Sequence, residues 1–367
     1  MLSARKKQLL RAAARVLVLT AVIFSSLTCT FSQEAIAGLA QGDAITDPKA
    51  ILRYALPIDN QAVRKMQNSL EDLSRQLRVK MWGKINKDIK AASFQLTIKK
   101  DAILAGVPEA AQPRAEEIIA ELVAGVAEMK EFAEVKDREA LYIKRRELLD
   151  LVSELEESMV VGYPFEVPQE YANLPQLKGR ATVEMETSRG TLSIVLDGYN
   201  APINAGNFVD LVERGFYDGL EFNRAEEFYI VQAGDPPGEA DGFIDPTTKE
   251  YRAIPLEVKT PDDEIPVYEA TLEEMGRYLD TPTLPFNAYG AIALARPADD
   301  PNGGSSQFFF FKFDTELTPP GYNLMDGRYS VFGYAVEGKD ALEDLTAGDK
   351  IISAKVVKGL ENLVQPS

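Results

Sequence analysis

Hydrophobic residues between positions 59 and 160 recur at spacings of three and four, which is the pattern of amphipathic helices. Four such stripes follow one another along the chain: Val63–Leu77, Trp82–Leu96, Ile118–Met129 and Leu141–Met159. Pro113 lies where the third helix can start. The breaks between the stripes are short, so neighbouring helices should run antiparallel. We therefore expect a helical bundle over residues 38–160, with the stripes as its core rather than as a cofactor site.

The pattern changes after residue 160. Gly162-Tyr163-Pro164 opens a stretch that predicts a linker over residues 161–179. Beyond it, polar residues alternate with apolar ones from Thr182 to Glu186, and again after the turn Ser188-Arg189-Gly190. This alternation on both sides of a turn predicts a β-hairpin.

The rest of the chain combines a helix with many short strands. The helix is expected over residues 202–214, and the strands after it are separated by Gly and Pro. This pattern predicts a closed β-barrel with a few helices over residues 180–360, followed by a tail over residues 361–367. The expected fold class is thus multidomain α + β, with an antiparallel helical bundle before the barrel.

The first 37 residues have the features of an export signal. Five bases and no acid lie within residues 1–15, and the apolar run Val16–Leu27 is shorter than the ~20 residues that span a bilayer. Ala35-Ile36-Ala37 supplies small residues for a cleavage site. We expect a signal peptide over residues 1–37. An uncleaved anchor and a lipoprotein modified at Cys29 remain open as alternatives.

Composition excludes several classes of chemistry. The 367 residues contain no His and one Cys, with a net charge of −17. Without His, the chain cannot form a Ser-His-Asp triad, a Cys-His dyad or a His-ligated zinc site. A single Cys cannot form an internal disulfide. The acidic balance argues against nucleic acid and anionic membranes as main partners.

The negative charge is concentrated in the second region. Residues 38–160 carry 19 bases and 21 acids, whereas residues 161–367 carry 16 bases and 35 acids. Four lysines of the second helix lie opposite its apolar stripe: Lys80, Lys84, Lys87 and Lys90. They form either a solvated helix face or a surface on which the helical domain docks on the acidic barrel domain, and both interpretations stay open.

Three strings in the second region are more specific than the strand pattern. They are Phe222-Asn223-Arg224-Ala225 with Tyr229 to Asp235, then Ala295-Arg296-Pro297 with Ser306 to Phe310, then Asp326 to Gly333. In order and spacing they resemble the cyclophilins, which are barrel-shaped peptidyl-prolyl cis-trans isomerases. The resemblance covers about residues 180–360 and implies an isomerase that uses no cofactor and no metal.

The resemblance implies roles for individual residues. Arg224 lies at the position of the catalytic arginine, and Gln232 at that of the glutamine that orients the substrate carbonyl. The remaining substrate-binding positions carried over are Phe222, Asn223, Tyr229, Ile230, Ala295, Arg296, Gln307, Phe309, Leu324, Met325 and Tyr329. A surface ion pair of Arg224 with Glu226 or Glu227, and a core role for Phe309, are the simpler alternatives.

This chemistry suits a chain without His. An amide bond isomerises over a barrier of about 18–20 kcal/mol, and an X-Pro bond does so in tens of seconds or more. An arginine lowers the barrier by donating a hydrogen bond to the prolyl nitrogen as the bond twists, while an apolar pocket holds the ring.

Four positions depart from the family pattern. Asn223 and Tyr329 stand where the family has histidines, Tyr229 where it has phenylalanine, and Leu324 where it often has tryptophan. These departures leave weak activity, altered peptide preference and binding without turnover all open. Cyclosporin-type ligands should bind poorly, because in the family their binding depends on contact with that tryptophan.

The segment Pro236–Tyr289 is longer and more acidic than a minimal cyclophilin needs. It contains Asp262-Asp263-Glu264 and Glu273-Glu274. The spacing does not match a calcium-binding loop, so we expect a solvated acidic insert.

The order of domains narrows the resemblance. A signal peptide, a helical domain that starts with Tyr54-Ala55-Leu56-Pro57-Ile58, and a divergent acidic cyclophilin domain are similar to the thylakoid-lumen cyclophilins of cyanobacteria and plants. That group implies a folding helper of the lumen or periplasm that assists photosystem II assembly and repair. Its partners would be proline-containing lumenal loops of photosystem II subunits. A non-catalytic assembly chaperone and a structural helical subunit with a passenger barrel are the competing interpretations.

Overall fold

The computed structural model describes residues 45–313 and 323–366. The predicted signal peptide over residues 1–37, and with it Cys29, lies outside these residues. Among the helices of the described part, none combines the length and the apolar character that crossing a bilayer requires.

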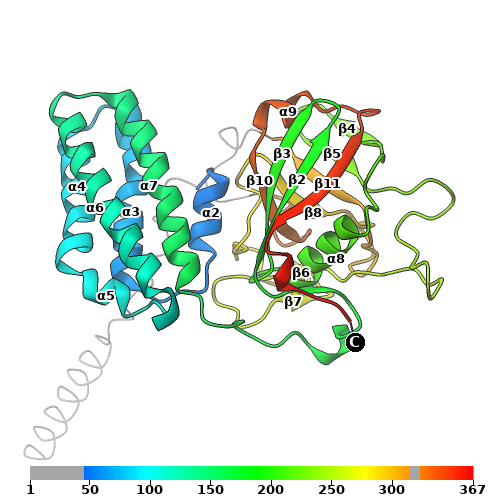
Figure 1. The fold of residues 1–367 in the computed structure, drawn as a ribbon. Coiled ribbons are helices and arrows are strands. Elements are labelled where there is room, and N and C mark those ends of the chain that lie inside the picture. Colours follow the sequence, from blue (N-terminus) through cyan, green and yellow to red (C-terminus); the bar gives the residue numbers. More distant parts are fainter. Residues whose placement is uncertain (1–44, 314–322, 367) are drawn as a thin grey trace, which may run out of the picture. The chain divides into compact units, whose positions relative to one another are not determined.

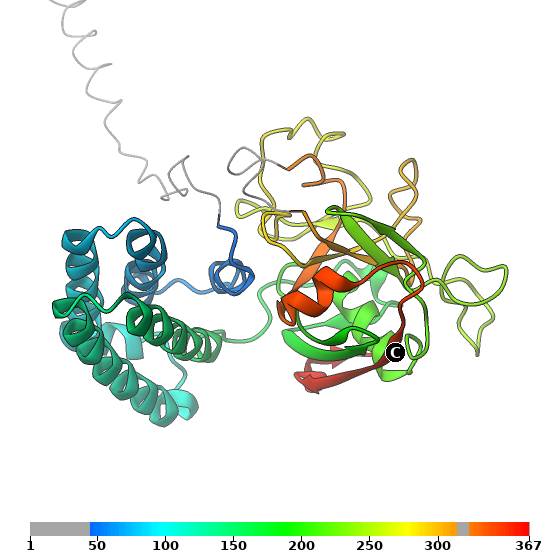
Figure 2. The same ribbon diagram turned by 90° about the horizontal axis from the view of Figure 1, so that it is seen from above.

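The four predicted helices are present and pack side by side (Figures 1 and 2). They are α3 (Gln61–Arg78), α4 (Trp82–Ile98), α6 (Gln112–Glu134) and α7 (Arg138–Ser158). The apolar stripes form one core, in which Met66, Leu122 and Leu155 are fully buried. The side chains of Asn60 and Asp137 accept hydrogen bonds from the first free N–H groups of α3 and α7, so both helices begin at capping residues. Three short helices were not predicted: α2 (Pro48–Tyr54), α5 (Lys100–Leu104) and η2 (Glu109–Ala111).

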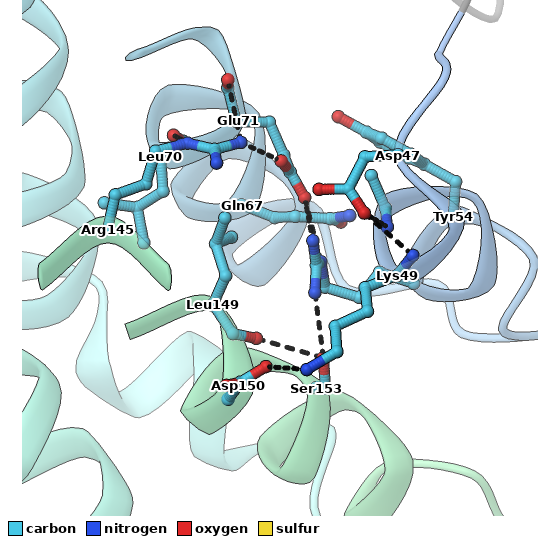
Figure 3. Close-up of polar contacts among 12 residues, drawn as sticks. Asp47, Lys49, Tyr54, Gln67, Leu70, Glu71, Arg145, Leu149, Asp150 and Ser153 are labelled. Carbon is cyan, nitrogen blue, oxygen red and sulfur yellow. Dashed lines mark hydrogen bonds and ion pairs between the residues drawn. The ribbon is translucent and has the colours of Figure 1, made fainter. Parts of the chain in front are cut away.

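Helix α2 is bound to the bundle by a buried ionic cluster. The Arg53 guanidinium is 2% exposed and donates to the Glu71 carboxylate of α3 at 2.6 and 2.8 Å. Glu71 also accepts from Arg145 of α7 at 2.5 Å (Figure 3). Ser153 of α7 accepts a further hydrogen bond from Arg53 at 3.2 Å. Each buried charge therefore has a partner, which is the condition for burying it.

Helix α2 also contributes to the core of the strand region. Ile51, Leu52 and Ala55 belong to the same apolar cluster as the sheet residues. The Arg180 guanidinium donates to the backbone carbonyl of Leu52, and Asn200 donates to that of Ala55 at 3.0 Å. Helix α2 thus belongs to the helical region in sequence but packs into the core of the strand region.

Ion pairs between helical and strand residues involve other charges than the predicted lysine stripe. Lys49 lies 3.6 Å from Glu337, and Glu157 lies 3.2 Å from Lys358. The side chains of Lys80, Lys84, Lys87 and Lys90 are exposed. Docking through these lysines stays a prediction.

The strand region combines an antiparallel sheet with a few helices, as predicted, but the sheet is a half-barrel and not closed. Eight strands pair antiparallel in the order β11-β2-β3-β10-β8-β9-β5-β4 (Figure 1). Their bounds are β2 (Arg180–Thr187), β3 (Gly190–Asp197), β4 (Arg224–Glu226), β5 (Ile230–Ala233), β8 (Ala291–Leu294), β9 (Phe308–Phe311), β10 (Val331–Glu337) and β11 (Ile351–Lys358). Within the described residues, β4 and β11 form no ladder with each other. The segments next to them are joined by an isolated bridge between Glu221 and Lys350 and by backbone hydrogen bonds between residues 219–222 and 348–351.

Shorter elements complete the region. They are η3 (Gln169–Tyr171), β1 (Gln176–Leu177), α8 (Pro202–Glu213), β6 (Glu257–Val258), β7 (Val267–Tyr268), α9 (Lys339–Asp344), η5 (Leu360–Asn362) and β12 (Leu363–Val364). The predicted linker thus contains η3 and β1, and β1 pairs with β12 in the predicted tail. Helix α8 confirms the helix expected at residues 202–214.

Alternation along β9 divides its four phenylalanines between two faces. Phe308 contacts Phe208 of α8 edge-on, with ring centroids 5.1 Å apart, and also contacts Phe310. Phe309 and Phe311 point to the other face and contact Phe286. The first pair fills the core, and the second pair places aromatic rings beneath the candidate site.

Candidate functional site

The strand register brings three predicted site residues into one row. Arg224 of β4 pairs with Gln232 of β5, which pairs with Phe309 of β9. Directly opposed residues of antiparallel strands project from the same face of the sheet. Residues separated by up to 85 positions therefore meet on one surface, as the resemblance implies for a catalytic arginine, its glutamine and a pocket phenylalanine.

Arg224 is 56% exposed and bound to a neighbouring acid. Its Nε donates to the Glu226 carboxylate at 3.0 Å, and its Nη2 donates to the same oxygen. The surface ion pair left open by the sequence is therefore formed. It does not exclude a catalytic role, because an exposed ion pair is weak and its donors can exchange partners.

A chain of amides and one carboxylate lies beside Arg224, where the resemblance implies the peptide groove. The Gln232 side chain donates to the Gln307 side-chain oxygen at 2.7 Å, and Gln307 donates to the backbone carbonyl of Asp241 at 2.8 Å. Asp235 accepts from Asn223 at 3.3 Å and from Gln307 at 3.4 Å. These bonds hold Gln232 and Gln307 in one orientation. Asp235 was not among the predicted site residues, although it ends the Gln232-to-Asp235 string.

The predicted proline pocket has an apolar floor that is almost closed. Phe309, Ile230 and Met325 are only 3–8% exposed. The Tyr229 hydroxyl lies 3.1 Å from the Met325 sulfur, which places the Tyr229 ring beside the floor. Burial, supported by the nearby Tyr329 and Glu226, raises the pKa of Tyr229. The phenol therefore stays neutral and contributes a polar group to the pocket wall.

The loop of residues 323–329 forms the opposite wall. Leu324 is 70% exposed, whereas the Tyr329 ring contacts Phe309 edge-on at 5.5 Å. The Asp326 carboxylate accepts from the backbone N–H of Phe286 at 2.8 Å. Burial raises the pKa of Asp326 to about 7, and the hydrogen bonds from backbone N–H groups oppose this rise. The hydrogen bond between Asp326 and Phe286 therefore holds the loop of residues 323–329 in place.

Arg296 and Ala295 support the groove instead of opening toward it. The Arg296 guanidinium donates to the carbonyl of Arg328 and lies 5.2 Å from the centre of the Tyr329 ring. The backbone N–H of Ala295 donates to the carbonyl of Gln307 at 2.9 Å. Arg296 therefore connects the end of β8 to the loop that carries the pocket wall, and Ala295 connects it to Gln307.

Phe222, a further predicted substrate-binding residue, does not reach the groove. Phe222 is fully buried in the apolar core, so it presents no surface to a peptide. The resemblance assigned it to the substrate together with Asn223, but alternation turns the two side chains to opposite sides.

Phe228 is a feature of the site that the sequence did not indicate. It forms the turn between β4 and β5 with φ of +58°, in the left-handed region, and its ring is exposed. A non-glycine residue in this conformation stores strain of about 1–2 kcal/mol. A glycine would make the same turn without strain, so the exposed ring is the unusual element.

The acidic insert is bound by internal partners. Asp263 pairs with Arg277 at 3.0 Å and accepts from Thr260 at 2.8 Å. Residues 45–313 and 323–366 contain no group of three or more Asp, Glu, His or Cys side chains that could hold a metal ion.

Comparison with known proteins matches both regions of the chain to family models. Residues 47–160 match the model described as "Peptidyl-prolyl cis-trans isomerase CYP38-like, PsbQ-like domain". Residues 182–360 match "Cyclophilin type peptidyl-prolyl cis-trans isomerase/CLD".

Full-length relatives cover both regions at once. The chain is 63% identical over 326 residues to a putative thylakoid lumen peptidyl-prolyl cis-trans isomerase of Synechocystis, covering 89% of this chain and 86% of the relative. It is 47% identical over 340 residues to the chloroplastic isomerase CYP38 of Arabidopsis thaliana, covering 90% and 78%. It is 32% identical over 340 residues to the chloroplastic CYP37 of the same plant, covering 86% and 70%.

Proposed function

The chain belongs to the cyclophilin-type peptidyl-prolyl cis-trans isomerases, and we propose that it performs this reaction in the groove around Arg224 as a folding helper of the thylakoid lumen. The observation that carries the proposal is the row of Arg224, Gln232 and Phe309 across three neighbouring strands. The row brings a cation, an amide and an apolar ring to one face, and these are the groups the reaction needs.

The geometry suggests a division of labour. As the X-Pro bond twists, its nitrogen loses conjugation and gains a lone pair that accepts a hydrogen bond from Arg224. Gln232, held by Gln307, binds the neighbouring peptide carbonyl. The pocket of Phe309, Ile230 and Met325 holds the proline ring. Glu226 already accepts from Nε and Nη2 of Arg224, so a bond from either of these atoms to the prolyl nitrogen forms at the expense of an existing one.

Proline-containing segments of client proteins are the substrates of the family. We propose that lumenal segments of photosystem II subunits are the clients of this chain and that residues 1–37 direct its export. The names of the Synechocystis and Arabidopsis relatives support the lumen as the compartment. Crosslinking in thylakoids with a photoreactive residue at position 229 would test the client, and recovery of no photosystem II subunit would contradict it.

A second candidate is a chaperone that holds the same segments without turnover. The nearly closed pocket floor and the ion pair of Arg224 favour it. The two candidates differ in stoichiometry, because a catalyst acts many times and a holding protein once.

A refolding assay separates the two. A substrate protein whose slow phase is limited by prolyl isomerisation refolds in about 10–100 s. If the proposal holds, one molecule of the full chain per twenty of substrate shortens this phase, and Arg224→Ala abolishes the effect. The matched control is Arg114→Ala, which removes another exposed, ion-paired arginine. An effect that needs equimolar chain and survives Arg224→Ala would support the holding chaperone instead.

A further inference from the structure

The part of the acidic insert that lies between β7 and β8 packs against the loop of residues 323–329, which forms one wall of the proline pocket. The backbone N–H of Leu272 donates to the carbonyl of Gly327 at 3.1 Å. Glu273 forms an ion pair with Arg328 at 2.5 Å. A Cβ at Gly327, whose φ is +74°, would come within 2.8 Å of the Leu272 side chain. The insert and the loop therefore pack so closely that no side chain would fit at position 327.

A hollow of about 90 Å³ opens between these two segments. Its wall consists of residues 272–273 and 277–281 from the insert, and of Asn323, Leu324, Asp326 and Arg328 from the loop. Met325, which lies between two of these residues, belongs to the floor of the proline pocket. Hollow and pocket are thus neighbouring parts of one surface. We name the hollow the insert subsite.

The wall of the insert subsite exposes apolar side chains. Leu279 is 88% exposed, Leu324 70% and Tyr278 65%. Such large apolar side chains gathered around one hollow mark a binding surface more often than a solvated one. These three side chains contribute little to the stability of the fold, because they bury little surface.

The two arginines around the insert subsite are already paired. Arg328 is bound by Glu273, and Arg277 is bound by Asp280 at 2.6 Å and by Asp263 at 3.0 Å. A charged ligand would have to displace one of these partners. An apolar side chain displaces only water, and it gains contact with the exposed leucines and the tyrosine.

We propose that the insert subsite binds a large apolar side chain, such as Leu, Met or Phe, that lies close to the proline in the client segment. The inference rests on the proposed function, since it assumes that a proline-containing segment occupies the groove. Adjacent Cα atoms of the loop are about 3.8 Å apart, and an extended peptide advances about 3.3 Å per residue. The apolar residue should therefore stand within about three positions of the proline.

Peptide titration by NMR tests the proposal on the full chain. The probes are seven-residue peptides with a central proline and alanines elsewhere, and a set in which Leu replaces one alanine at each position in turn. We expect Leu at one position to tighten binding about tenfold over the alanine peptide, as for burial of one such side chain. Leu279→Ala should reduce this ratio to about twofold or less, and Tyr278→Ala should reduce it as well.

Controls separate the possible failures. Ile352→Ala removes an exposed apolar residue of β11, and it should keep the tenfold ratio. Since Leu279 is exposed, its truncation should leave the unfolding midpoint unchanged. No gain from Leu at any position, or a gain that Leu279→Ala leaves intact, would overturn the insert subsite while the alanine peptide still binds. Failure of the alanine peptide to bind would instead contradict the proposed function. Self-association that Leu279→Ala abolishes would assign the hollow to a second copy and overturn the proposal.

Discussion

The ion pair between Arg224 and Glu226 leads to a prediction opposite to that for most mutations near an active site. The Arg224 guanidinium donates from Nε at 3.0 Å, and also from Nη2, to one oxygen of Glu226. A prolyl nitrogen that approaches Nε or Nη2 competes with this carboxylate for its donors, and the negative charge also weakens every other donor of the guanidinium. Glu226→Gln keeps the size of the side chain and removes its charge, so it should free Arg224 and increase the rate of isomerisation.

The size of the increase follows from the exposure of the pair. Arg224 is 56% and Glu226 44% exposed, so solvent screens their attraction. Exposed ion pairs contribute about 0.2–1 kcal/mol. Releasing Arg224 should therefore raise the rate about 1.4- to 5-fold, since about 1.4 kcal/mol corresponds to a factor of ten. High salt should have the same effect on the natural chain, because the Debye length falls to about 3 Å at 1 M.

Exchange NMR on an Ala-Pro peptide measures this rate directly. The natural chain and Glu226→Gln are compared at 0.05 M and 1 M salt, at equal saturation with peptide. Glu117→Gln serves as the control, because Glu117 pairs with the exposed Arg114 in the bundle at 3.2 Å. We expect the two chains to differ at low salt and to converge at high salt, with the control equal to the natural chain.

One result would refute this reasoning. If Glu226→Gln lowers the rate or leaves it unchanged while Arg224→Ala abolishes it, Glu226 does not compete for the arginine. A lowered rate would mean that Glu226 holds the guanidinium in its working position.

Three further changes test the stability of the fold, each by urea unfolding. Burial raises the pKa of Glu156 from 4.5 to about 7, although Arg64 lies 3.3 Å away. The contribution of Glu156 to the free energy of unfolding is therefore full below pH 4.5 and lost as the pH rises through 7. Glu156→Gln should raise the free energy of unfolding by up to about 3 kcal/mol over the natural chain at pH 8 and leave it unchanged at pH 4, and an equal rise at both pH values would contradict this. Phe228→Gly should stabilise by about 0.5–1 kcal/mol, because relief of left-handed strain exceeds the entropy that glycine loses; a loss would show that the exposed ring packs. Arg53→Ala should destabilise by about 3 kcal/mol or more, because it leaves Glu71 buried with one partner fewer, and a change below 1 kcal/mol would refute a structural role for the cluster.

The periodicity of the sequence was sufficient to predict the four long helices and the hairpin. Each has many residues on a regular spacing, and the structure buries the predicted stripes. The short helix α2 has only seven residues, too few for a period to be visible. Its apolar residues also join the core of the strand region, and no local pattern distinguishes one core from the other.

Barrel closure could not be predicted from the strands alone. Closure depends on whether the first and last strands of the order pair, and β4 has only three residues with which to do so. The sequence pattern gives the strands and their alternation but not the register between distant ones. Whether the sheet forms a half-barrel or a closed barrel therefore becomes visible only in the folded structure.

The candidate site was located through its motifs, and its polar network was not. Arg224, Gln232 and Phe309 meet as the resemblance implied. The ion pair of Arg224 depended on the side-chain position of Glu226, which the spacing of the motif does not give, and its catalytic role stays a proposal. Asp235 and the insert subsite depend on contacts between segments far apart in sequence, which spacing does not reveal.

The most direct test of the account is the exchange rate of an X-Pro peptide bound to the full chain, compared with Arg224→Ala. Removal of a single transition-state donor typically lowers a rate about 10²–10³-fold. We predict a loss of this size in the variant, with peptide affinity changed only a few-fold. Equal rates in both chains, or no acceleration by the natural chain at peptide saturation, would contradict catalysis by Arg224.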